Sequence, residues 1–93
     1  MLRLRGRGRR SQVEIMYVIL KVCLDGTASK TKIVYDANLN FTRLKKYLSL
    51  LLNMGYLFEE NNPNKRVVYR TTKAGRLFIR SFSWKRRATR NKR

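Results

Sequence analysis

The chain has 93 residues, 43% of them hydrophobic, which is enough for one domain with a modest core. Its 23 Lys and Arg residues outnumber five Asp and Glu residues, and the resulting net charge of +18 favours polyanionic partners, above all nucleic acid. Because there is no histidine and Cys23 is the single cysteine, the usual general base and the usual metal ligands are missing, so we expect no enzyme activity, no metal and no cofactor.

The first ten residues form a basic arm. Closely spaced like charges and two glycines oppose a fixed fold, so residues 1–10 are predicted to be disordered. A solubilising tail is one interpretation, but contact with DNA phosphates or the minor groove is favoured, because arginine-rich segments commonly order on a polyanion. The arginines concerned are Arg3, Arg5, Arg7, Arg9 and Arg10.

A buried helix is predicted next. Ser11 and Glu14 have the spacing of a capping box, and the helix is expected to run to about Leu24, before a turn at residues 25–27. Its apolar residues cover more than one side, which predicts a central place in the core, with Cys23 as a small core hydrophobe. The apolar run Ile15–Leu20 is too short for a signal peptide or a membrane span, so a cytoplasmic protein without membrane contact is expected.

Residues 31–53 have a helix-turn-helix pattern. A short helix over Thr31–Ala37, with Ile33, Val34 and Ala37 inward, is followed by a three-residue turn in which Leu39 plugs the core. A second helix follows over Asn40–Asn53, capped by Asn40 and ended by Gly55. Its apolar face is expected to contain Phe41, Leu44, Leu48, Leu51 and Leu52.

The opposite face of this second helix is polar and cationic, which suits the major groove of DNA. Arg43 can pair with a guanine edge, whereas the lysines of the preceding helix suit phosphates. The predicted contacts are Thr42, Arg43, Lys45, Lys46 and Ser49 on the recognition helix, and Lys30, Thr31 and Lys32 on the helix before it.

A β-hairpin is predicted after the recognition helix. Its strands are Tyr56–Glu60 and Arg66–Thr71, joined by a turn-rich segment, and the second strand should direct Val67, Tyr69 and Thr71 into the core. A hairpin in this place is typical of a wing that touches the DNA backbone or minor groove. The predicted wing contacts are Asn64, Lys65 and Arg66.

The last predicted helix begins after Thr72 as its cap. Gly75 indicates that another backbone passes close by, and the apolar face is expected to contain Ala74, Leu77, Phe78, Ser81 and Phe82. This is more large apolar surface than one small domain buries, which predicts a two-fold homodimer. The expected interface is Leu77, Phe78, Phe82 and Trp84, and the basic tail beyond it adds DNA contacts at Arg86 and Arg87.

The order of these motifs resembles the archaeal winged helix-turn-helix DNA-binding proteins. The resemblance rests on the run Asp36–Phe41, Leu44–Leu48, Gly55–Leu57 and the segment Tyr69–Gly75, and it covers about residues 11–82. It implies an α+β, mostly helical fold with a three-helix core, a two-stranded wing and a C-terminal dimerisation helix. It also implies a transcriptional regulator or a small chromatin-associated protein, a type also found in archaeal viruses.

The predicted organisation is therefore a disordered arm (1–10), a winged helix-turn-helix domain (11–72), a dimerisation helix (73–85) and a disordered basic tail (86–93). The predicted partner is double-stranded DNA, in the nucleoid. A regulator is slightly favoured over a non-specific chromatin protein, because the polar face of the recognition helix leaves room for sequence readout. An RNA-binding or ribosome-associated protein is less favoured, since no exposed aromatic pair on a sheet is evident. A protein-interaction or membrane-surface module built on Phe78, Phe82 and Trp84 is the remaining alternative.

Overall fold

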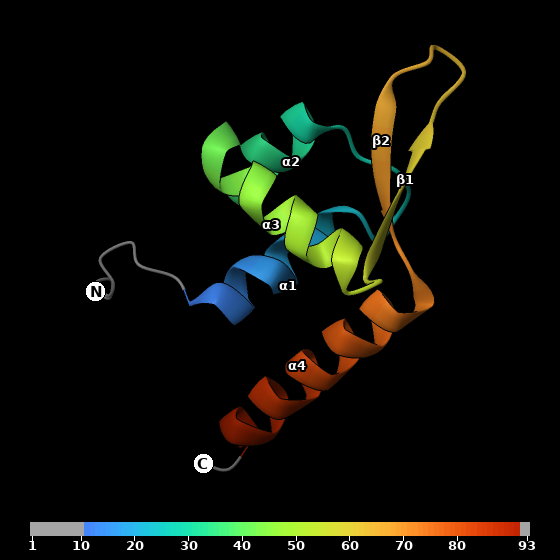
Figure 1. Cartoon of the computed structure of the whole chain (residues 1–93). Coiled ribbons are helices and arrows are strands. Elements are labelled where there is room, and N and C mark those ends of the chain that lie inside the picture. Colours follow the sequence, from blue (N-terminus) through green and yellow to red (C-terminus); the bar gives the residue numbers. More distant parts are fainter. Residues whose placement is uncertain (1–10, 92–93) are drawn as a thin grey trace.

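The computed structural model describes the backbone of residues 11–91 and the side chains of residues 11–82. The basic arm predicted over residues 1–10 lies outside the described residues. The elements follow the order helix, helix, helix, strand, strand, helix (Figure 1), and the α+β fold with a wing is confirmed. They are α1 (Gln12–Val22), α2 (Lys30–Ala37), α3 (Phe41–Asn53), β1 (Leu57–Asn61), β2 (Val67–Thr71) and α4 (Lys73–Asn91).

Helix α1 is the centre of the core, as predicted. Its N-terminus has the complete capping box: Ser11 Oγ accepts from the Glu14 backbone N–H at 3.1 Å, and the Glu14 carboxylate accepts from the Ser11 N–H at 3.0 Å. The side chains of Ile15, Ile19 and Leu20 are almost completely buried, with α2 and α4 both packed against the helix. Cys23 follows the last turn and is also buried; desolvation raises the pKa of its thiol to about 12, so it is a neutral core side chain.

The α2–α3 turn is set by its own side chains. Asn38 takes the left-handed conformation (φ 56°, ψ 55°), which asparagine tolerates better than most residues. Asn40 Oδ1 then accepts from the Arg43 backbone N–H at 2.8 Å and caps α3, as predicted. Leu39, between them, is partly buried against the core. The direction of α3 is thus fixed at its first turn.

The apolar face of α3 differs from the prediction at two positions. Leu44, Leu48 and Leu51 are buried, but Phe41 is 55% exposed, and Tyr47, at 5%, lies in the core instead. Phe41 is the first residue of the helix, so its turn extends past the core that the later turns cover. A helical wheel gives the direction of a side chain but not where along the axis the core ends.

The wing is an antiparallel pair in which Leu57 faces Thr71 and Asn61 faces Val67. The segment before α2 pairs with the other edge of β2 through a single antiparallel bridge, in which Ala28 and Tyr69 exchange two backbone hydrogen bonds of 2.8 and 3.0 Å. Tyr69 and Thr71 are buried as predicted, but Val67 is 43% exposed. Val67 is the first residue of β2 and pairs with Asn61 at the hairpin end of the ribbon, so the alternation of inward and outward side chains is not followed by burial there.

Helix α4 is anchored to the turn between α3 and β1. Thr72 Oγ1 donates to the Gly55 carbonyl at 2.6 Å and accepts from the Gly75 N–H at 3.1 Å, while the Thr72 N–H donates to the Tyr56 carbonyl at 3.0 Å. The predicted close backbone approach at Gly75 is confirmed: an added Cβ would meet the Tyr56 carbonyl oxygen and lie 2.6 Å from Cγ2 of Thr71. The predicted cap at Thr72 is confirmed as well.

Two predictions for α4 are corrected. The helix continues past Lys85 to Asn91, so most of the segment expected to be a disordered tail is helical. On its core side the buried residue is Ile79, accompanied by partly buried Phe78 and Phe82, whereas Ala74, Leu77 and Ser81 are exposed. The side of α4 that packs against the core is therefore rotated by about one residue from the predicted apolar face. The close contact of Gly75 with the turn before β1 determines which side of the helix faces inward.

Candidate nucleic-acid interface

The outward face of α3 contains all five of the predicted recognition residues. Each of these side chains is exposed, although the apolar side of the same helix is buried. Within residues 11–82, none of the three cations on this face has an ion-pair partner, so their charge is available to an anionic ligand. The residues are Thr42, Arg43, Lys45, Lys46 and Ser49.

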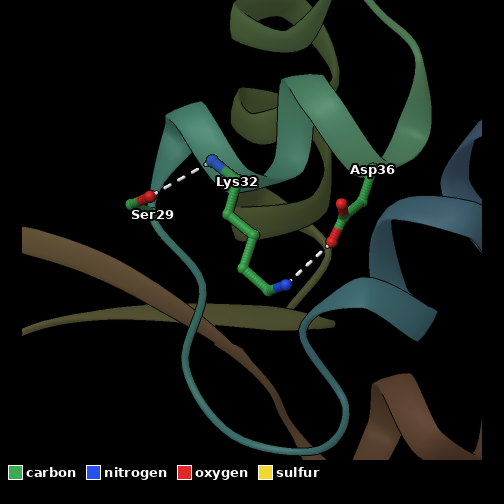
Figure 2. A network of polar contacts seen from close by, with 3 residues as sticks. All are labelled: Ser29, Lys32 and Asp36. Atoms are coloured by element: carbon green, nitrogen blue, oxygen red, sulfur yellow. Dashed lines mark hydrogen bonds and ion pairs between the residues drawn. The ribbon is translucent and has the colours of Figure 1, made fainter.

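Helix α2 presents a different electrostatic situation. Ser29 Oγ caps the helix by accepting from the Lys32 backbone N–H at 3.2 Å, while the Lys32 ammonium donates to Asp36 Oδ2 at 2.8 Å (Figure 2). The hydrogen bond and the charge of Asp36 raise the pKa of Lys32. Lys30 and Thr31 are exposed without such a partner among the described residues. One of the predicted phosphate contacts is therefore already engaged within the chain.

The tip of the wing is ordered by Asn62. Its side-chain oxygen accepts from the backbone N–H groups of Asn64 and Arg66, both at 3.0 Å, and its carbonyl accepts from Lys65 N–H at 2.8 Å. Lys65 adopts a left-handed conformation (φ 63°), a position at which glycine or asparagine is favoured. The tip therefore has a lysine at a backbone position that favours glycine or asparagine. The side chains of Asn64, Lys65 and Arg66 are all exposed.

The first turn of α3 and the tip of the wing both lie on the side of the domain away from α4 (Figure 1). The start of α3 and the tip of the wing are thus both distant from the predicted dimer helix, whereas the C-terminal end of α3 lies near the first turn of α4. The predicted tail contacts, in residues 1–10 and in the side chains of Arg86 and Arg87, lie outside the described parts of the chain.

The predicted dimer residues have unequal environments. Phe78 and Phe82 pack within the chain, with ring centroids 5.3 Å from Tyr56 and 4.5 Å from Tyr17 respectively. Leu77, by contrast, is 56% exposed. A shallow pocket of about 150 Å³ lies nearby between α1 and α4, lined by Val13, Phe78, Ser81 and Phe82. The side chain of Trp84 is outside the described residues.

Two exposed aromatic residues lie on these helices outside the predicted site. Tyr35 on α2 is 84% exposed, and Phe41 stands at the start of α3 next to Thr42. The exposure of Tyr35 could have been predicted from the sequence, because this residue falls outside the inward-facing positions of its helix. The exposure of Phe41 could not, because its position on the helical wheel is among those of the buried residues.

The described residues do not offer a metal site or a membrane span. Residues 11–82 contain no group of three or more His, Cys, Asp or Glu side chains placed to hold a metal ion. No helix within the described part of the chain is both long and apolar enough to cross a membrane.

Comparison with known proteins agrees with this geometry. Residues 9–89 match the winged helix-turn-helix family. The uncharacterized protein MJ0287 of Methanocaldococcus jannaschii is 37% identical over 51 residues, which are 55% of this chain and 53% of that protein, so the match spans about half of its length.

Two solved structures have the same fold. Sso10a-2, a DNA-binding protein from Sulfolobus solfataricus, superposes with a TM-score of 0.76 at 29% identity, covering 88% of this chain and 84% of the other. Streptococcus pneumoniae FabT, solved in complex with DNA, superposes with a TM-score of 0.70 at 21% identity, covering 86% of this chain and 55% of the other. The resemblance to archaeal winged helix-turn-helix proteins is confirmed, as is the assignment to a non-enzyme fold. The chain belongs to the winged helix-turn-helix family.

Proposed function

We propose that this protein binds double-stranded DNA as a transcriptional regulator, with α3 in the major groove and the wing on the backbone or minor groove. The observation that carries the proposal is the outward face of α3, where short polar side chains and three cations without acidic partners in residues 11–82 share one exposed surface. Such a face supplies both phosphate attraction and donors for base edges.

Electrostatics and relatives support the same partner. The net charge of +18 gives the chain a strong attraction to polyanions. Sso10a-2 is a DNA-binding protein with the same fold and 29% identity. Non-specific DNA packaging is the second candidate, since the charge alone suffices for it; RNA binding is a weaker one and is tested by competition between duplex DNA and single-stranded RNA.

The experiment is duplex affinity across a salt series, measured on random DNA and on the DNA upstream of the gene. Each phosphate contact contributes about −0.9 to the slope of log affinity against log salt. A regulator retains higher affinity for one sequence as salt and competitor increase. Equal affinity for all duplexes with a steep slope would favour packaging, and failure to bind either duplex would rule out the DNA-binding proposal.

We propose further that the protein is a homodimer through α4. Leu77 is more than half exposed, and exposed Val13 and the apolar pocket lie close to the same face. A two-fold contact between copies would cover this surface. DNA-binding dimers of this kind present two recognition helices to successive half-sites.

Leu77→Glu is expected to give a monomer, because removing a carboxylate from water into an apolar contact carries a large desolvation cost. Because the Leu77 side chain is exposed in the single chain, the substitution should leave the fold of the monomer intact. The measurement is sedimentation equilibrium, with circular dichroism to verify helix content. Thr27→Glu makes an equal charge change in the exposed loop before α2 and should leave the protein dimeric by the same measurement. If wild type is monomeric at micromolar concentration, the dimer proposal fails.

Asp36→Asn is expected to tighten duplex binding several-fold. The change releases Lys32 from its 2.8 Å ion pair and makes it available to a phosphate. The salt slope should steepen by up to about 0.9. Stability should change little, because solvent screens an exposed ion pair at this helical spacing.

The matched control is Asp25→Asn, which removes the same charge from the loop after α1. Equal increases in affinity from both substitutions would mean that only net charge matters. In the Lys32→Ala background, Asp36→Asn should have no additional effect; a full increase there would contradict the assignment to Lys32.

A further inference from the structure

The first turn of α3 exposes a large apolar side chain at the edge of the apolar stripe, beside the polar and cationic residues of this helix. Phe41 is 55% exposed, while Leu44, one turn later on the same stripe, is 1% exposed. The next residue is Thr42, and Lys45 lies one turn along the helix from Phe41. The apolar ring therefore sits beside the side chains expected to meet DNA, rather than in the core.

The position of this ring is held by the turn before it. Asn40 caps the helix through the Arg43 N–H, and the Leu39 N–H donates to the Val34 carbonyl at 3.0 Å. Leu39 is itself packed against the core. Because the backbone at residues 38–41 is tied at several points, Phe41 projects from a defined place at the N-terminal end of the helix, where recognition helices contact base edges.

We propose that Phe41 is a specificity-determining residue that contacts the C5-methyl group of thymine in the major groove. This inference rests on the proposed DNA-binding function. Of the groups that base pairs present in the major groove, the thymine methyl is the apolar one, and Phe is among the side chains suited to it. The surrounding cations complement a duplex and oppose an approach by a basic partner such as a second copy of this face.

The test uses the full chain and the tightest-binding duplex recovered from a random-sequence selection. That duplex is prepared with thymine and again with deoxyuridine in place of every thymine, which removes the methyl groups and keeps the base-pairing hydrogen bonds. Wild type should bind the deoxyuridine duplex about fourfold more weakly for each thymine methyl that the ring covers. Phe41→Ala should bind the thymine duplex more weakly and no longer distinguish the two.

Met54→Ala is the matched control, since Met54 is an exposed apolar residue at the opposite end of α3. It should retain the preference for thymine, and Phe41→Leu should retain part of it. Thermal unfolding checks that each variant is folded. Equal binding of both duplexes by wild type, or a thymine preference that survives Phe41→Ala, would overturn the inference while leaving DNA binding intact. Failure of the selection to enrich any duplex would overturn sequence readout, and the proposed role of Phe41 with it.

Discussion

Replacing Arg43 and Lys46 together with alanine is expected to weaken binding to the preferred duplex by about 100-fold. Both side chains are exposed on the outward face of α3 and have no acidic partner within residues 11–82. A good bidentate base contact contributes about 1–3 kcal/mol of discrimination, and removal of a phosphate contact adds to this. Gel-shift or fluorescence-anisotropy titration of the preferred and random duplexes at fixed salt measures the effect.

Single substitutions should separate base readout from phosphate contact. Arg43→Ala is expected to reduce the preference for the selected duplex, whereas Lys45→Ala should weaken all duplexes alike and lower the magnitude of the salt slope by about 0.9. Lys21→Ala with Arg80→Ala removes one lysine and one arginine from α1 and α4 and is the matched control for the double variant. An effect as large in this control as in the Arg43 and Lys46 variant would show that α3 is not the main contact.

Gly75→Ala is expected to lower the free energy of unfolding by about 1–3 kcal/mol. The added methyl would meet the Tyr56 carbonyl oxygen and Cγ2 of Thr71, and neither the carbonyl nor the helix can move without disturbing the Thr72 hydrogen bonds. In an open helix the same substitution would be favourable by about 1 kcal/mol, so the sign of the effect identifies the close approach. Thermal unfolding should show a decrease of roughly 10 °C.

Ala74→Val tests whether added bulk on α4 is harmful in itself. Ala74 is exposed, so only a small cost from helix propensity is expected. Thr71→Ser in the Gly75→Ala background removes Cγ2 and keeps the hydroxyl that donates to the Leu20 carbonyl at 2.8 Å, so partial recovery should follow. An unchanged melting temperature for Gly75→Ala would mean that α4 does not pass this close to the turn.

The ends of the elements follow from local chemistry and were predictable from the residues. Ser11 with Glu14, Asn40 and Thr72 act as caps on backbone groups a few positions away, and Gly55 has the positive φ expected after α3. These interactions involve neighbours in the chain, so a short sequence contains all the information they need.

The burial of individual side chains needed the tertiary structure. Tyr47 is buried where Phe41 was expected, and Val68 is buried although strand alternation favoured Val67. In α4 the inward residue is Ile79 rather than Leu77. Periodicity gives the direction of a side chain relative to its own helix or strand, but the extent of the neighbouring elements decides where along that element the core begins and ends.

The same division applies to the proposed interface. Sequence by itself determined the helix-turn-helix, the wing and the exposure of the α3 cations, because amphipathic spacing separates a charged face from an apolar one. Only the tertiary structure showed that Lys32 is paired with Asp36 and that Phe41 stands outside the core. The physical reason is that a helical spacing permits an ion pair or a buried contact, whereas the side-chain conformations on α2 and the extent of the core along α3 decide which of these is made.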